Sequence, residues 1–150
     1  MRERGFSYVV MMFVVAIAGL VAARAVENSL TNERREKEAD LLYVGQAYRN
    51  AIASYYENSP GTFKQYPAEL SDLLLDSRTS TMRRHLRKLF RDPITGDSKW
   101  GVLRDEDGRV VGVFSLSERE PVKQGGFAPE LASFTGMKRY MDWKFVYQPQ

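Results

Sequence analysis

The chain has 150 residues, 43% of them hydrophobic, with 22 Lys and Arg against 19 Asp and Glu and no Cys. This length and composition fit one modest domain and exclude collagen-like and disordered chains. Without cysteine the chain forms no disulfide and has no thiolate nucleophile and no Cys-based zinc site. The formal net charge of +3 is too small to indicate a polyanion as partner of the chain as a whole.

The strongest feature of the sequence is an uncharged stretch, residues 6–23, which follows Arg2 and Arg4 and precedes Arg24. As a helix it would extend about 27 Å, close to the ~30 Å hydrocarbon core of a bilayer. Its Gly, Ala and Ser residues let a neighbouring helix approach closely. The sequence therefore predicts a single membrane-spanning helix, with the basic N-terminus in the cytoplasm and the rest of the chain on the other side.

Three interpretations of this stretch stay open. As a secretory signal peptide it would be removed after the A-x-A tripeptide Ala23-Arg24-Ala25. As a plain anchor it would hold a monomeric domain at the membrane. In the third interpretation Arg4-Gly5-Phe6 is a processing site, because a short basic leader ends there in Gly and an aromatic residue opens the apolar stretch.

This third pattern resembles the start of type IV pilins and type II secretion pseudopilins. The resemblance implies that a prepilin peptidase cuts after Gly5 on the cytoplasmic face of a bacterial inner membrane and that the new N-terminus, Phe6, is methylated. It also implies that the apolar helices leave the lipid and stack in a filament with other pseudopilins, on an inner-membrane assembly platform driven by a partner ATPase. Filament and membrane residues of this helix would include Val10, Phe13, Ile17 and Leu20.

One residue departs from the family pattern. The family usually has Glu at the fifth residue after the cut, where it is thought to pair with a neighbour's terminal amine, and this chain has Val10. The departure indicates a non-standard subunit or a minor, tip-like one.

Helical periodicity continues beyond the membrane stretch. No proline occurs before Pro60, so nothing forces a break in the helix for some 50 residues after Phe6. The charged residues 33–38 are expected to form an exposed, solvated part of the helix, supported by opposite charges three and four positions apart. After them an apolar stripe with helical spacing follows, formed by Leu41, Val44, Tyr48, Ile52 and Tyr55.

These patterns predict an α+β, pilin-like fold. Its parts would be a leader at 1–5, the transmembrane half of a long helix at 6–23, the periplasmic half at 24–58, and a globular head at 59–150. The expected elements of the head are a short helix beginning at Pro67 and strands at 100–103, 109–115 and 143–147 with an Asp-Gly hairpin turn. Residues 117–141 are expected to form a long loop or a short helix around 129–134.

The order of two further motifs strengthens the resemblance to the major pseudopilin of type II secretion. One is Tyr66-Pro67-x-x-Leu70-x-x-Leu73, which follows the long helix. The other is Asp92-Pro93-Ile94-Thr95-Gly96 ahead of Trp100-Gly101 and the expected sheet. The resemblance then covers residues 1 to about 117.

Asp105 and Asp107, followed by Gly108, begin like an oxygen-rich calcium loop. The resemblance implies calcium here, because major pseudopilins bind it in a loop near the C-terminus. The Glu that would complete an EF-hand-type loop is absent, since Phe114 occupies its position, and a hairpin turn accounts for all three residues. Both Asp residues are therefore weak metal candidates, and no cofactor is expected.

The single His, His85, lies in the basic segment 82–91, whose apolar residues have helical spacing. We expect a docked helix with a cationic outer side and a surface His. Nucleic acid is not the expected partner, because no aromatic residues interleave with the basic ones.

No nucleophile motif or glycine-rich phosphate loop is present, so no enzymatic activity is expected. The expected function is that of a structural pseudopilin-like subunit. The alternative is a membrane-anchored or secreted monomeric binding module of the periplasm.

Overall fold

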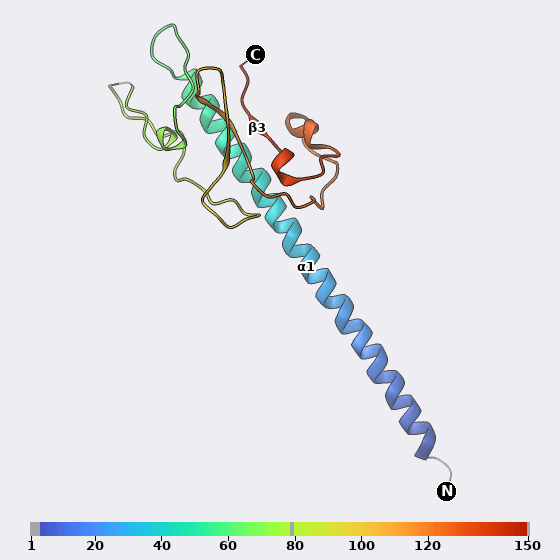
Figure 1. Cartoon of the computed structure of the whole chain (residues 1–150). Helices are drawn as coiled ribbons and strands as arrows, with labels where there is room; N and C mark the ends of the chain where they lie inside the picture. The colour runs from blue at the N-terminus through green and yellow to red at the C-terminus, as the bar shows by residue number, and fades with distance from the viewer. Residues whose placement is uncertain (1–3, 79, 150) are drawn as a thin grey trace. The chain divides into compact units, whose positions relative to one another are not determined.

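The computed structural model describes residues 4–78 and 80–149, with the backbone alone for residues 4–6. Its elements are α1 (Arg4–Glu57), η1 (Leu70–Leu73), β1 (Gly101–Arg104), β2 (Val110–Phe114), η2 (Pro129–Phe134), η3 (Tyr140–Asp142) and β3 (Phe145–Val146), where η marks a 3-10 helix (Figure 1). The chain divides into two units, Met1–Glu36 and Lys37–Gln150, and α1 contributes to both.

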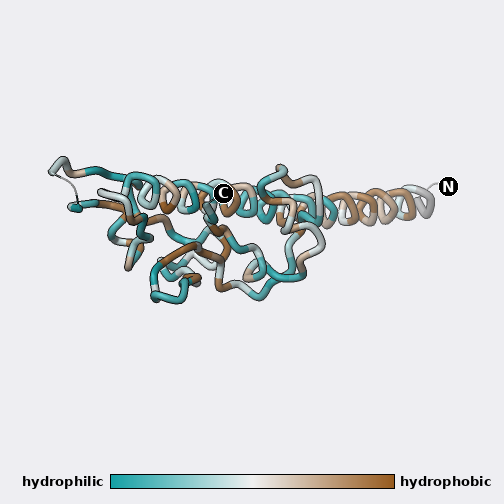
Figure 2. Tube along the Cα trace, turned by 90° about the horizontal axis from the view of Figure 1, so that it is seen from above, coloured by the Kyte–Doolittle hydropathy of each residue, from teal (hydrophilic) through white to brown (hydrophobic). Residues whose placement is uncertain are grey.

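The long N-terminal helix is confirmed. α1 covers 54 residues without a proline, and it ends at Glu57, just before the Asn-Ser-Pro-Gly turn. Figure 2 shows the change in hydropathy along it, from continuously hydrophobic near the N-terminus to mixed further on. Of the predicted leader, residues 1–5, the first three lie outside the described residues, and the backbone of Arg4 and Gly5 begins α1.

The core of the C-terminal unit forms on the apolar stripe of α1, which is buried as predicted. Tyr48 and Ile52 are 1% and 0% exposed, and they join a cluster that includes Leu73, Trp143 and Phe145. A helix with one apolar face gains most of its stability from such packing.

The three strands form one antiparallel sheet in the order β1-β2-β3. The β1–β2 hairpin turns at the predicted Asp-Gly pair, where Gly108 has φ 76°, a conformation that glycine adopts without strain. A Cβ at Gly45 of α1 would lie 2.4 Å from the Phe145 ring, so β3 packs closely against the helix at this point. With the long helix and the short 3-10 turns, this sheet gives the α+β, pilin-like layout that the sequence predicts.

The short helix expected from Pro67 is present as the 3-10 helix η1, which begins later than predicted, at Leu70. One predicted helix of the head is wrong. Residues 82–91 form no helix. Their cations would repel one another at helical spacing, and the backbone finds other partners: His85 and Leu86 donate to the Leu73 carbonyl.

Candidate functional site

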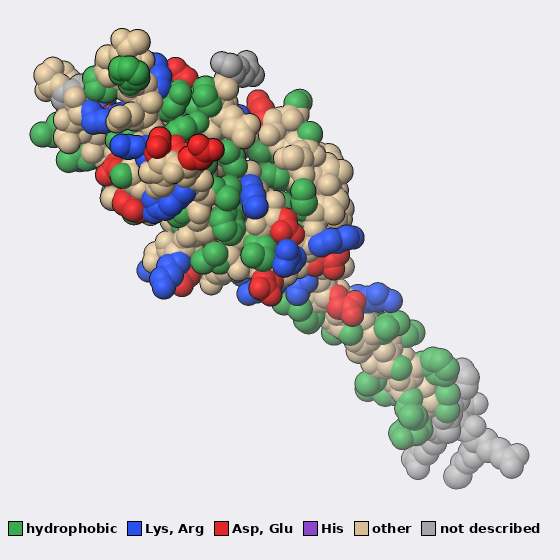
Figure 3. All heavy atoms as spheres, turned by 45° about the horizontal axis from the view of Figure 1, so that its top comes forward, with side chains coloured by type: hydrophobic (Ala, Val, Ile, Leu, Met, Phe, Trp, Pro, Cys, Tyr) green, Lys and Arg blue, Asp and Glu red, His purple; other side chains and the backbone are tan. Residues whose placement is uncertain are grey.

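The apolar half of α1 is the most unusual surface of the described chain. Every described side chain from Ser7 to Lys37 is exposed, among them Met11, Met12 and Leu20 at 63%, 57% and 63%. Figure 3 shows hydrophobic side chains gathered on this part of α1, while the head carries a mixture of both charges on the face in view. Among the described residues, α1 is the one helix long and apolar enough to cross a membrane.

The four residues predicted to serve membrane and filament contacts lie on this surface. Val10 is 44% exposed, and the others are more exposed: Phe13 67%, Ile17 59% and Leu20 63%. Spacings of three and four place them on one side of α1, yet Met11, Met12 and Val15 make the other sides apolar too. A helix that is apolar all round requires lipid or other helices around it.

The predicted processing site lies at the start of α1. The backbone of Gly5 and Phe6 is helical, and their side chains are not described. At the other end of the apolar stretch Arg24 forms an exposed ion pair with Glu27, at 3.5 Å. Arg24 is the first charged residue after the apolar stretch.

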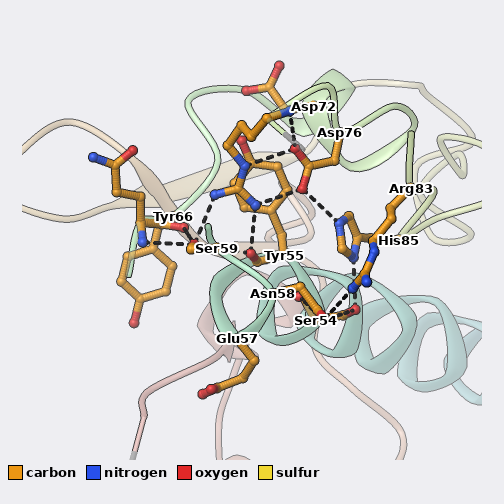
Figure 4. Close-up of polar contacts among 12 residues, drawn as sticks. Ser54, Tyr55, Glu57, Asn58, Ser59, Tyr66, Asp72, Asp76, Arg83 and His85 are labelled. Atoms are coloured by element: carbon orange, nitrogen blue, oxygen red, sulfur yellow. Dashed lines mark hydrogen bonds and ion pairs between the residues drawn. The ribbon is translucent and has the colours of Figure 1, made fainter. Parts of the chain in front are cut away.

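A polar network closes the C-terminal end of α1 (Figure 4). A helix end leaves four carbonyls without partners inside the helix. Here all four are occupied. The Ser54 carbonyl accepts from Asn58, and the Tyr55 carbonyl accepts from Arg78. The Tyr56 carbonyl accepts from the Ser59 backbone, and the Glu57 carbonyl accepts from Lys64.

Arg78 is the centre of this cap. Its guanidinium donates to the Tyr55 carbonyl at 2.8 Å and to Ser59 Oγ at 2.9 Å, and its Cζ lies 3.5 Å from the centroid of the Tyr55 ring. It also forms a bidentate pair with buried Asp76, at 2.9 and 2.7 Å. Since the last turn of α1 has no basic residue of its own, this distant cation complements the negative end of the helix dipole.

His85 belongs to the same network, and its predicted surface position is wrong. The side chain is 3% exposed, with Nε2 3.2 Å from Asp76 Oδ2 and Nδ1 2.8 Å from Ser54 Oγ. The sequence has no motif that joins these three residues, and Figure 4 shows the imidazole between the other two side chains. The hydrogen bond from the Arg78 side chain lowers the pKa of Asp76 well below its usual range, and burial opposes this effect.

The order Ser54, His85, Asp76 is that of a nucleophile, a base and an orienting carboxylate. The surroundings fit a structural cap better. Asp76 is already paired with Arg78, and the buried imidazole offers a substrate no access. The network holds the Arg78 and His85 side chains, together with Asp76, against the last turn of α1.

Asp105 is occupied by the hairpin turn. Its carboxylate accepts from the backbone N–H groups of Asp107 and Arg109, at 3.0 and 2.8 Å, and its carbonyl accepts from Gly108. In the described part of the chain no group of three or more His, Asp or Glu is placed to hold a metal ion. The turn therefore explains the sequence pattern that suggested calcium.

The charged segment 33–38 differs from prediction at one residue. Glu38 is 3% exposed rather than solvated, and its carboxylate accepts from the backbone of Val122 and Lys123 and from the Tyr140 hydroxyl. A buried carboxylate with three donors is satisfied. No local pattern indicates this burial, because the donors lie more than 80 residues away.

Comparison with protein-family models, with curated proteins and with solved structures gives no match. The function is therefore inferred from the residues themselves. The features that bear on it are the apolar helix, its continuation as the core of the C-terminal unit, and the order of motifs along the chain.

Proposed function

We propose that the protein is a structural, pseudopilin-like subunit of a type II secretion or type IV pilus-like filament of a bacterial inner membrane. In this proposal the N-terminus lies in the cytoplasm and the head in the periplasm. Prepilin peptidase, other subunits, an assembly platform and its ATPase are the partners, and the chain itself supplies no catalysis.

The observation that carries this proposal is that one helix, α1, has an exposed apolar segment followed by a segment that forms part of the head's core. The same helix is apolar all round from Ser7 to Ala23 and amphipathic from Leu41 to Tyr55, where one face forms the core of its unit. A plain membrane anchor does not need this continuity, because a flexible linker suffices to tether a domain. A filament subunit uses both segments, because the apolar one stacks with other helices while the amphipathic one carries the core of the head.

Assembly moves the apolar segment from lipid to helix contacts. This exchange gives little hydrophobic gain, because lipid tails are as apolar as the side chains they replace. Close packing then favours the filament, and the small residues Ala16, Gly19 and Ala23 allow close approach. A Cβ at Gly19 would meet no atom within 4 Å, so this surface is open to a neighbour.

Mass spectrometry of the N-terminus in the native host tests the processing step. The mature chain should begin at methylated Phe6, and Gly5→Arg should leave the full leader attached. Gly19→Arg is not a suitable control, because it would disturb insertion; Gly61→Arg, in an exposed loop, should be processed normally. A mature chain beginning at Val26 would contradict the proposal and indicate a secreted protein.

Disulfide cross-linking tests the stacking of α1, and the absence of native cysteine makes the background clean. Ile17→Cys should give cross-linked chains in membranes that contain the whole assembly system. The matched control, Asn50→Cys on the exposed face of the C-terminal unit, reports random collision. Equal, weak cross-linking at both positions would favour the monomeric binding module instead.

A further inference from the structure

The segment 82–91, which we call the cationic loop, concentrates positive charge on the head. Together with the five residues before it, the loop (77–91) contains six Lys and Arg, Arg78 among them, and no Asp or Glu. Five of the six are exposed, and these are Arg83, Arg84, Arg87, Lys88 and Arg91. The proposed filament function does not use this loop, since that function depends on α1.

The cationic loop is held firmly although it has no regular secondary structure. Arg83 pairs with the Asp76 backbone, and the buried His85 side chain contacts Ser54 and Asp76. At the other end the backbone of Phe90 donates to the Tyr48 hydroxyl at 2.9 Å and accepts from Trp100 Nε1 at 2.8 Å.

These anchors leave the basic residues between them facing solvent. Leu86 is buried, whereas Arg84, Arg87 and Lys88 are exposed. The cations are thus presented on a backbone that is already ordered. Binding of a partner therefore costs little conformational entropy of the loop, because tertiary contacts have already fixed its backbone.

The charge of the loop is not neutralised within the described chain. Arg83 donates to the neutral Asn58 side chain, and Lys88 lies over the Phe90 ring, 5.4 Å from its centroid. Among the described residues no Asp or Glu forms an ion pair with any of the five cations. The nearby carboxylate, Asp76, is already committed to Arg78.

We propose that the cationic loop is a docking surface for an acidic protein segment that also carries apolar side chains. Two apolar residues of the loop, Met82 and Leu89, are 71% and 45% exposed beside the cations. Arginine outnumbers lysine four to one among the exposed cations, and its planar fork binds carboxylates in bidentate fashion.

Two other anionic partners fit these residues less well. Single-stranded nucleic acid requires exposed aromatic rings on which bases stack, and Phe90, the aromatic residue of the loop, is engaged with Tyr48. An anionic membrane surface is a diffuse field of charge, which does not require a fixed loop or bidentate geometry. An acidic, partly apolar protein surface uses the cations, the exposed Met82 and Leu89, and the order of the loop together.

The test uses the full chain in nanodiscs of zwitterionic lipid. The probe is a fluorescent 16-residue peptide of Glu, Asp and Leu, with a Gln, Asn and Leu peptide of the same pattern as its control. The loop variant is Arg84→Gln with Arg87→Gln and Arg91→Gln. The matched control variant, Lys99→Gln with Arg119→Gln and Lys144→Gln, removes the same charge from exposed positions elsewhere on the head.

Fluorescence anisotropy should show saturable binding of the acidic peptide and none of its uncharged control. The loop variant should weaken that binding about tenfold and the control variant no more than about threefold. In the native background, Met82→Gln with Leu89→Gln should also weaken binding of the acidic peptide. The salt dependence of binding should not change, since these residues carry no charge.

Equal loss in the loop and control variants would overturn the proposal, because general attraction to a basic protein would then explain the binding. Absence of binding up to millimolar peptide would overturn it as well. Tighter binding to a 20-base-pair duplex or to anionic vesicles would replace the protein partner by a polyanion. Urea unfolding of each variant, followed by Trp fluorescence, checks that the head remains folded. None of these outcomes depends on processing at Gly5 or on stacking of α1, so this proposal and the filament function fail separately.

Discussion

The Tyr140 hydroxyl donates a hydrogen bond of 2.7 Å to the carboxylate of Glu38, 102 residues earlier in the chain. Both side chains are buried, and the same carboxylate accepts from the backbone of Val122 and Lys123. One acidic residue of α1 thus holds two separate segments of the C-terminal part of the chain against the helix.

Glu38→Ala should therefore lower the free energy of unfolding by about 2–4 kcal/mol, because it leaves buried donors without an acceptor. Glu36→Ala, on the exposed part of the same helix, should change it by no more than about 0.5 kcal/mol. Urea titration followed by Trp fluorescence measures both, since Trp100 and Trp143 are buried in the head. Equal effects of the two substitutions would show that Glu38 is solvated in solution.

Gly45→Ala should destabilise the C-terminal unit by about 1–3 kcal/mol, although Ala is the better helix former. Its Cβ would lie 2.4 Å from the Phe145 ring, and that ring cannot move freely because it is 1% exposed. Gly19→Ala is the control, since its Cβ would meet no atom within 4 Å. If thermal unfolding of the two variants is the same, β3 does not pack on α1 as described.

The Asp76 pair should make stability depend on pH in the acid range. The hydrogen bond from Arg78 lowers the pKa of the folded Asp76, while the unfolded residue has a pKa of about 3.9. The contribution of Asp76 to the free energy of unfolding is therefore complete above its pKa in the unfolded chain. It is lost as the pH falls towards the lower pKa of the folded chain.

Urea midpoints between pH 6 and pH 2.5 measure this contribution. The stability advantage of the native chain over Asp76→Asn should be constant above about pH 5 and shrink below about pH 4. Asp107→Asn, at an exposed position, should run parallel to the native chain throughout. A gap between native chain and Asp76→Asn that does not change with pH would contradict the proposed pairing.

Val10→Glu should increase the number of copies in each filament. In the proposed assembly a carboxylate at this position pairs with the terminal amine of a neighbour, which the native Val10 cannot do. Quantitative mass spectrometry of purified filaments gives the copy number relative to other subunits. Val9→Glu, at the adjacent position, controls for the presence of a carboxylate in the bilayer. A native chain already present in many copies along the filament would exclude a role at the tip.

Removing calcium should change the melting temperature of the head by no more than about 1 °C, because the turn already occupies Asp105. A site bound at 100 times its dissociation constant would contribute about 2.7 kcal/mol, a shift of several degrees. Asp105→Ala should destabilise the hairpin by about 1 kcal/mol with or without calcium, since two backbone N–H groups lose their acceptor. A fall of several degrees in melting temperature with chelator would show that a metal ion binds here and contradict this prediction.

Several features of this fold follow from the sequence because they depend on neighbouring residues. The spacing from Leu41 to Tyr55 identifies the buried face of α1, and this face is buried in the structure. The Asp-Gly pair at 107–108 places the hairpin, because glycine readily adopts the positive φ of that turn. The apolar composition of residues 6–23 likewise indicates a membrane helix, because length and hydropathy are properties of the segment alone.

Only the tertiary structure decided which charged and polar side chains of these segments are buried. Local patterns favour a solvated Glu38, a surface His85 and a helix at residues 82–91. The structure instead places both side chains in buried networks and leaves the segment irregular.

The physical reason is that a polar group is stable in the interior only where partners meet it, and these partners are distant in sequence. Glu38 depends on Tyr140, and His85 depends on Ser54, 31 residues away. Hydrophobic periodicity records which face of an element turns inward, but it contains no information about which distant donor will face which acceptor once the elements have packed.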